Sequence, residues 1–355
     1  MRPDAVDDAE RVPHGGTRER DLLEFSANVN PRRPAGVREV YERALDDATR
    51  YPDDDYSAFR DAAAAYVSRA ATVDVGPEAV VPTPGGLAAI RLAMATTLAA
   101  GDRVLVPKPS FGEYAREVDL QGASTTFVAH DDLLSVETGT ATTDDVDLGD
   151  HRLAVVCNPN NPTGDAYDAE VLREFAARCR DAGTTLLVDE AFLGFTDEPS
   201  MAGEPGVVVA RSLTKLFGLP GLRAGFAVAT GRERERLATA RRAWNLGGPA
   251  AAVGAHCLRD AAFVAETRDR VASERERVRE RLPADVTGRP GVAPFVLCDV
   301  GDRDPVDVVA GCRQHGVAVR DATTFRDLDS HVRVAVRERE ANDELLAALA
   351  AVVDP

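Results

Sequence analysis

Short apolar runs alternate with amphipathic stretches over the first two thirds of the chain. The runs have the length of strands that are buried on both faces of a sheet. They are residues 103–106, 153–157, 184–188 and 207–211. Between them lie stretches of helical period, such as the one that places Ile90, Met94 and Leu98 on a single stripe. Strands that alternate with helices indicate an α/β fold with a mostly parallel sheet.

The last third of the chain predicts a second, smaller α/β unit. A charged helix is expected at about 262–282, followed by strands interleaved with helices. The expected strands are residues 295–298, 317–320 and 331–337. A turn-rich stretch around Gly247 and Gly248 precedes this unit. We therefore predict an N-terminal arm (1–44) that joins the small domain, a large domain (45–245) and a small C-terminal domain (246–355).

Composition narrows the choice of partners and compartment. The chain has 355 residues, 44% of them hydrophobic, which is enough for a large core. Its net charge of −17 argues against a nucleic-acid partner and is typical of a salt-rich cytoplasm. No apolar run is long enough to span a bilayer, so we expect a cytoplasmic protein without a membrane partner. The five cysteines and six histidines show no metal spacing, and no metal site is predicted.

Lysine is nearly absent, and one of the two copies lies in a glycine-rich segment. Of 42 basic residues only Lys108 and Lys215 are lysines. Lys215 follows Ser212 by three residues and precedes Arg223 by eight, which describes a tight loop suited to an anion. A primary amine can form a Schiff base, and a guanidinium cannot. The alternative is that low lysine content reflects a composition bias and leaves Lys215 without a special task.

An acidic residue is expected to lie close to this amine. The buried run 184–188 ends at Asp189, and the next run, 207–211, leads directly into Ser212 and Lys215. Ligands of open α/β sheets bind at the carboxyl ends of the strands, so the acid and the amine can meet there. An aspartate beside a pyridine nitrogen keeps that nitrogen protonated and makes the ring an electron sink.

Two further segments follow predicted strands. Residues 158–164 read Asn-Pro-Asn-Asn-Pro-Thr-Gly, which could also be an ordinary turn. Residues 83–87 read Thr-Pro-Gly-Gly-Leu and open the helix that carries Ile90. The free N–H groups of such a helix start can bind phosphate without a basic side chain.

These four segments, in this order, resemble the class I/II aminotransferase family of fold-type I pyridoxal-phosphate enzymes, with matches from about residue 14 to 340. The resemblance implies a large domain with a central, mostly parallel sheet flanked by helices, and a smaller α/β C-terminal domain. It implies pyridoxal 5'-phosphate as cofactor. Lys215 would form the Schiff base and move protons, and Asp189 would pair with the pyridinium nitrogen.

The resemblance also assigns the cofactor's other contacts. Asn161 would hydrogen-bond the phenolic oxygen, and Phe111 would stack on the ring, although a core phenylalanine is the alternative. Phe192 stands where many relatives have a tyrosine that donates to the same oxygen. The phosphate would be held by Ser212, Arg223 and the amides of Gly86 and Leu87. Tyr51 matches a tyrosine that reaches the phosphate of the neighbouring subunit, which implies a homodimer.

The substrate side of the predicted site depends on arginine and on the N-terminus. Arg333 lies in an alternating strand and matches the arginine that grips the substrate carboxylate, with a surface arginine as the alternative. The segments His14-Gly15-Gly16 and Phe25–Pro31 are similar to the opening of the L-threonine-O-3-phosphate decarboxylase branch, which serves cobalamin biosynthesis. Arg32 and Arg33 replace the usual Leu-Gly of that branch.

We therefore expect decarboxylation of L-threonine O-3-phosphate, with Arg333, Arg320, Asn30 and His14 binding the substrate. The alternative within the family is an aminotransferase that acts on histidinol phosphate or a related amino acid. A third possibility is a catalytically silent protein that binds the cofactor, but such a protein would be expected to lose Lys215 or Asp189, and both are present.

Overall fold

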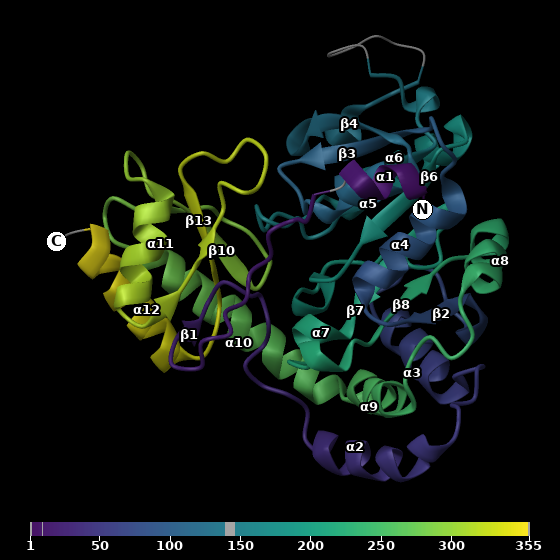
Figure 1. Cartoon of the computed structure of the whole chain (residues 1–355), viewed down its shortest axis with the longest axis horizontal. Helices are drawn as coiled ribbons and strands as arrows, with labels where there is room; N and C mark the ends of the chain where they lie inside the picture. Colours follow the sequence, from purple (N-terminus) through teal and green to yellow (C-terminus); the bar gives the residue numbers. More distant parts are fainter. Residues whose placement is uncertain (1, 9, 139–145, 354–355) are drawn as a thin grey trace.

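A seven-stranded sheet forms the centre of the larger lobe in the computed structural model, which describes residues 2–8, 10–138 and 146–353 (Figure 1). In spatial order its strands are β2 (Val80–Thr83), β8 (Gly225–Val228), β7 (Val207–Ser212), β6 (Thr185–Asp189), β5 (Leu153–Cys157), β3 (Arg103–Lys108) and β4 (Ser124–Ala129). All strands are parallel except β8, which runs against both of its neighbours. The predicted α/β fold with a mostly parallel sheet is confirmed.

Helices cover both faces of this sheet because its strands are apolar on both sides. Along β7, Val207 and Val209 pack on one face, and Val208 and Ala210 pack on the other. The first face is covered by α3 (Ser57–Ser68), α6 (Ala169–Ala182) and α9 (Gly248–Arg259). The second face is covered by α4 (Gly86–Thr97), α5 (Glu113–Gln121) and α8 (Gly231–Ala240). This layering explains why the strands appear in the sequence as continuous apolar runs.

A second sheet forms the core of the smaller lobe. Its antiparallel strands are, in spatial order, β12 (Arg320–Asp321), β13 (His331–Ala335), β10 (Phe295–Asp299) and β9 (Thr287–Gly288). The helices of this lobe are α11 (Pro305–Gln314) and α12 (Arg339–Val353). The predicted charged helix is α10 (Ala261–Glu280), which runs between the two lobes (Figure 1).

The N-terminal arm contacts both lobes. Its short helix α1 (Pro3–Asp8) lies beside α5, and the amide of Arg2 donates to the carbonyl of Leu120 at 2.9 Å. Strand β1 (Leu23–Glu24) pairs with β11 (Val317–Ala318) of the smaller lobe. Helix α2 (Val37–Asp46) then packs against α9. The domain limits at residues 44 and 245 remain a prediction.

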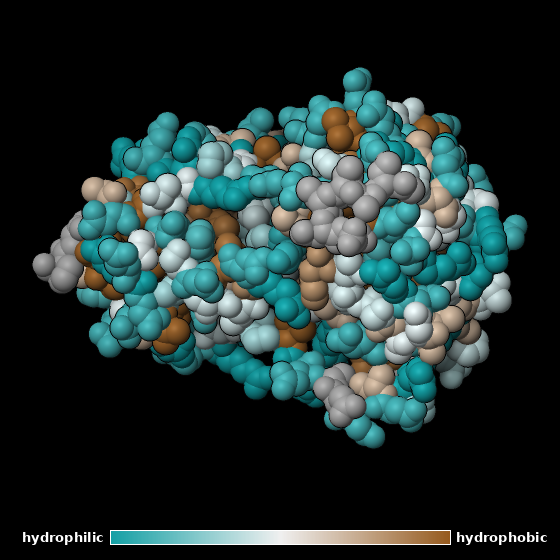
Figure 2. All heavy atoms as spheres, turned by 90° about the horizontal axis from the view of Figure 1, so that it is seen from above, coloured by the Kyte–Doolittle hydropathy of each residue, from teal (hydrophilic) through white to brown (hydrophobic). Residues whose placement is uncertain are grey.

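Short helical turns complete the chain, and one of them carries the predicted lysine. That turn is α7 (Leu213–Leu216), which follows β7 directly. The remaining turns are 3₁₀ helices at Asp47–Thr49, Pro77–Ala79, His130–Ser135, Leu148–Asp150, Leu193–Phe195 and Pro220–Leu222. None of the helices in the described ranges is long and apolar enough to cross a membrane. Hydrophilic residues cover most of the face shown in Figure 2, in keeping with the acidic composition.

Candidate active site

A cavity of about 340 Å³ lies at the carboxyl ends of β5, β6 and β7. Its walls come from the N-terminal arm, the large sheet and the smaller lobe. It brings together most of the residues that the sequence analysis selected. These are His14, Gly86, Leu87, Phe111, Asn161, Asp189, Phe192, Ser212, Lys215, Arg223, Arg320 and Arg333.

Asp189 is a buried carboxylate at the end of β6. One carboxylate oxygen accepts the hydroxyl of Tyr114 at 2.6 Å, and the other accepts the amide of Ala191 at 3.0 Å. Burial raises the pKa of Asp189, and the Tyr114 and Ala191 hydrogen bonds oppose this rise. The two donors therefore hold the side chain in one orientation and favour its charged form, which suits it to bind a protonated ring nitrogen.

Lys215 lines the cavity from α7, which directly follows β7. Strand β7 pairs with β6, the strand that ends at Asp189. Ser212 caps this turn, and the Lys215 carbonyl accepts the amide of Asn30 at 3.0 Å. The pKa of Lys215 is lowered to about 8, first by burial and then by the charges of Arg333 and Arg223, while the charge of Asp189 opposes the shift. At pH 7 about a tenth of the molecules therefore carry the neutral amine, which is the nucleophilic form, far more than for an ordinary lysine.

Glycines at the start of α4 allow a cationic side chain and a hydroxyl to approach the backbone. A Cβ at Gly85, where φ is 98°, would lie 2.7 Å from Nη2 of Arg223, and a Cβ at Gly86 would lie 3.0 Å from Cβ of Ser212. The Ser212 and Thr214 hydroxyls lie 2.7 Å apart beside this turn. Amides, hydroxyls and a guanidinium form the donor set that binds a phosphate group. The residues present therefore fit the phosphate of pyridoxal phosphate.

Arg333 is buried on β13 without a carboxylate partner among the described residues. It donates through Nη1 to Oδ1 of Asn161 and through Nη2 to the Ser26 carbonyl at 3.1 Å. Its guanidinium carbon lies 5.1 Å from the ring centre of Phe295 and 5.7 Å from that of Phe325. Burial lowers the pKa of Arg333 to about 9. A buried, unpaired cation that faces a cavity is suited to an anionic ligand.

Arg320 is the cross-strand partner of Arg333 in the β12–β13 pair, so both side chains project from the same face. Its Nη2 donates to the Pro13 carbonyl at 2.9 Å and to the Thr324 hydroxyl at 2.7 Å. Like Arg333, it forms no ion pair with a carboxylate within the described ranges. The cavity therefore presents two adjacent guanidiniums whose charges the protein does not neutralise.

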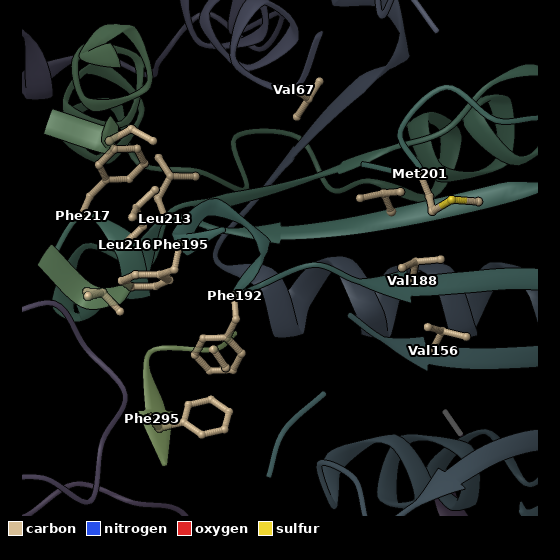
Figure 3. Close-up of a cluster of buried hydrophobic side chains, with 14 of the residues drawn as sticks. Val67, Val156, Val188, Phe192, Phe195, Met201, Leu213, Leu216, Phe217 and Phe295 are labelled. Carbon is tan, nitrogen blue, oxygen red and sulfur yellow. The ribbon is translucent and has the colours of Figure 1, made fainter. Parts of the chain in front are cut away.

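Two aromatic residues that the sequence predicted, Phe111 and Phe192, line the cavity. Phe111 lies 5.6 Å from the ring of Tyr114, edge to face, and 5.8 Å from the ring of His14. Phe192 is buried and meets Phe295 edge to face at 5.2 Å, as Figure 3 shows. Phe192 carries no hydroxyl, so it contributes an apolar surface where a tyrosine would donate a hydrogen bond.

His14 reaches the cavity from the N-terminal arm. Its Nε2 lies 2.9 Å from Oε1 of Glu113, whose other carboxylate oxygen lies 3.4 Å from Nη1 of Arg116. The pair fixes the imidazole at the cavity mouth while half of the His14 side chain stays exposed. His14 is thus placed where a substrate group could contact it.

Asn30 does not line the cavity, and its predicted contact with the substrate is not supported. Its amide nitrogen donates to the Leu216 carbonyl at 2.8 Å and to Thr267 at 3.3 Å, and its oxygen accepts from Arg270 at 2.7 Å. Through these hydrogen bonds, Asn30 connects the N-terminal arm to α7 and α10. Asn28 lines the cavity instead, is buried, and has an Oδ1 without a hydrogen-bond partner.

Tyr51 lies outside this cavity as well. It is 78% exposed and stacks on Trp244 at 4.5 Å in a groove beside the start of α9. This position agrees with a residue that reaches another subunit, which remains a prediction. Two residues of the cavity were not predicted from the sequence: Asn28, which lies within the segment Phe25–Pro31, and Tyr114, which follows Phe111 by three residues.

Comparisons with known proteins agree with this geometry. The model of the family "Aminotransferase class I and II" matches residues 20–349. The chain is 30% identical over 338 residues to histidinol-phosphate aminotransferase 2 of Archaeoglobus fulgidus, covering 93% of each chain. It is 30% identical over 346 residues to threonine-phosphate decarboxylase of Salmonella typhimurium, covering 92% of this chain and 90% of that protein.

A solved structure shows the same fold. Histidinol-phosphate aminotransferase from Clostridium acetobutylicum superimposes with a TM-score of 0.81 at 24% identity, over 94% of this chain and 99% of that one. The match extends over both lobes of the protein. The chain belongs to the class I and II aminotransferase family, whose members are pyridoxal-phosphate enzymes.

Proposed function

We propose that this protein decarboxylates L-threonine O-3-phosphate to (R)-1-aminopropan-2-ol O-2-phosphate, with pyridoxal 5'-phosphate as cofactor. The observation that carries the proposal is the pair of adjacent guanidiniums, Arg320 and Arg333, without carboxylate partners in the described ranges. Threonine phosphate carries a carboxylate and a phosphate at once, so it can occupy both cations. Histidinol phosphate carries no carboxylate and would leave one of them without a counter-charge.

The N-terminal arm supports the same assignment. His14 and Asn28 lie in the two segments that are similar to the decarboxylase branch, and both line the cavity. Asn28 has an unpartnered, buried oxygen, which can accept a hydrogen bond from a substrate amine or hydroxyl. The arm therefore contributes polar groups to the cavity.

The residues of the cavity divide the work of the reaction. Pyridoxal phosphate, when bound, supplies an electron sink for the electron pair left at the substrate α-carbon. Asp189 would keep the ring nitrogen protonated, and Lys215 would hold and move a proton at the α-carbon. Arg333 fixes the carboxylate, and Arg320 fixes the second anionic group. This clamp would fix the orientation of the bonds at the α-carbon, and so decide whether carbon dioxide or a proton leaves.

A second candidate function is transamination of histidinol phosphate or a related amino acid. The match to histidinol-phosphate aminotransferase 2 of Archaeoglobus fulgidus, at 30% identity over 93% of this chain, favours it. Both reactions use the same cofactor residues, so Lys215 and Asp189 do not distinguish them. A silent cofactor-binding protein is a more remote candidate, since both residues are present.

We also propose that the active unit is a cytoplasmic homodimer in which Tyr51 reaches the cofactor phosphate of the partner. Two observations support this. Tyr51 is exposed and stacks on Trp244, and Tyr51 also lines an open groove of about 1,110 Å³ formed by the segment after α2, the start of α3 and α9. Large exposed aromatic residues beside such a groove are typical of a protein interface.

The test of the reaction uses two parallel incubations of the cofactor-loaded protein. One contains L-threonine O-3-phosphate and is followed for carbon dioxide and aminopropanol phosphate. The other contains histidinol phosphate with 2-oxoglutarate and is followed for glutamate. Carbon dioxide release that Lys215→Ala abolishes supports the decarboxylase, whereas glutamate formation without carbon dioxide release supports the aminotransferase.

A further inference from the structure

A second cavity, of about 270 Å³, lies at the opposite end of the large sheet from the active site. It is formed where β5, β6 and β7 begin, by the ends of α4 and α6 and the first turns of α8. Thr185 lines this cavity and Asp189 lines the active site, and both belong to β6. Four steps of about 3.3 Å place the two ends of that strand about 13 Å apart. The two sites are therefore separate.

Arginine dominates the lining of this cavity. Four arginines line it, Arg152 partly buried and Arg180, Arg232 and Arg236 exposed, and Glu233 is the single acidic residue of the lining. The lining thus carries a net positive charge, whereas the whole chain has a net charge of −17. Such a local excess of positive charge attracts anions despite the negative surroundings.

The protein leaves most of this charge uncompensated. Within the described ranges Arg152, Arg232 and Arg236 form no ion pair, and Arg180 has only an exposed contact of 3.8 Å with Asp181. Arg152 is oriented by a bond of 3.4 Å from its Nε to the Thr97 carbonyl. Its Nη groups remain available to a ligand.

The backbone and nearby hydroxyls add to the arrangement. A Cβ at Gly206, where φ is 77°, would lie 3.5 Å from both Cβ and Cγ of Arg180, so the Arg180 stem rests on this glycine. The hydroxyls of Thr97 and Thr185 line the cavity without a hydrogen-bond partner in the part of the chain that the structure describes. Guanidiniums with free hydroxyls between them form a donor-rich site with few acceptors.

We propose that this cavity binds a multivalent oxyanion, namely the phosphate groups of a small phosphorylated molecule. Guanidiniums bind phosphate oxygens through paired, nearly parallel hydrogen bonds. A site with four of them and a volume of about 270 Å³ accommodates a diphosphate or a phosphate ester with a small organic part. The inference does not depend on which reaction the active site performs.

The test is calorimetric titration of the cofactor-loaded protein with inorganic pyrophosphate at constant ionic strength. We expect the double variant Arg232→Gln with Arg236→Gln to bind at least about tenfold more weakly than wild type, because two charge-assisted contacts are lost. Arg281→Gln removes one charge from an exposed position at the end of α10 and should leave the affinity unchanged. Titrations with inorganic phosphate and glycerol 3-phosphate distinguish a free oxyanion from a phosphate ester.

Two results would overturn the proposal. One is the absence of any pyrophosphate binding. The other is binding that the double variant leaves unchanged but Arg333→Gln abolishes, since pyrophosphate would then occupy the catalytic cavity. Turnover of the double variant without added phosphate should equal that of wild type, which shows that the variant is folded and that its active site is intact.

Discussion

Replacing Arg333 by methionine should show whether Arg333 binds the substrate or stabilises the fold. Methionine keeps much of the length of the side chain and removes its charge. Burial lowers the pKa of Arg333 to about 9. An arginine ordinarily keeps its charge to a pH several units higher, so at 1.36 kcal/mol per pH unit the charged form is disfavoured in the fold by about 5 kcal/mol. This cost is fully present below pH 9 and decreases as the pH rises above it.

The substitution also removes favourable contacts. The Asn161 side-chain oxygen and the Ser26 carbonyl each lose a donor, at about 1–3 kcal/mol for each group left unsatisfied. The two effects nearly offset each other. We therefore expect the free energy of unfolding of the cofactor-free protein at pH 7 to change by less than about 2 kcal/mol, whereas breaking a buried ion pair costs about 3–5 kcal/mol.

Catalysis should respond very differently. Loss of a buried charge contact with the substrate carboxylate costs about 2–5 kcal/mol, so the catalytic efficiency with threonine phosphate should fall by at least about 30-fold. Urea unfolding and steady-state kinetics of Arg333→Met measure both quantities, with Arg281→Met as the matched exposed control. A large loss of stability together with unchanged catalytic efficiency would refute the assignment of Arg333 to the substrate.

Three further perturbations test the cofactor residues. Tyr114→Phe removes a hydrogen bond to the Asp189 carboxylate that is worth about 1.5–3 kcal/mol. Titration of the cofactor-free variant should therefore show about 10- to 100-fold weaker cofactor binding, and an unchanged affinity would contradict the role given to Asp189. Because the pKa of Lys215 is lowered to about 8, the rate at which it reacts with the cofactor aldehyde should rise with pH around that value. A midpoint near the ordinary pKa of lysine would show that burial and the nearby arginines do not lower the pKa of Lys215. Gly85→Ala places a Cβ 2.7 Å from Nη2 of Arg223 at a position where φ is positive, so it should weaken cofactor binding in a fluorescence titration. Gly101→Ala is the control, because Gly101 also has a positive φ but has open space around it.

The fold was largely predictable because the apolar runs have the period and length of buried strands. Four such runs became the parallel strands β3, β5, β6 and β7 with limits that differ by at most two residues. The meeting of Asp189 and Lys215 followed from the same pattern, since adjacent parallel strands end at one edge. The antiparallel course of β8 was not predictable, because its direction depends on pairing with β2 and β7 far away in the sequence.

The errors at the site have local causes. Asn28 and Asn30 are two residues apart and would share a face of a regular strand. A turn in which the Val29 amide donates to the Ala27 carbonyl at 2.9 Å breaks that regularity, so only Asn28 faces the cavity. Tyr114 follows Phe111 by three residues, and a turn in which the Tyr114 amide donates to the Phe111 carbonyl at 3.1 Å leads into α5 and brings the two rings together.

The central claim is that the cavity directs the substrate toward loss of its carboxylate. The most direct measurement uses carboxyl-labelled L-threonine O-3-phosphate with the cofactor-loaded protein in the absence of any 2-oxo acid, and counts labelled carbon dioxide against aminopropanol phosphate. Our account predicts equimolar amounts of the two products over many turnovers. Retention of the label in the substrate, with turnover appearing only when 2-oxoglutarate and an amino donor are supplied, would contradict it.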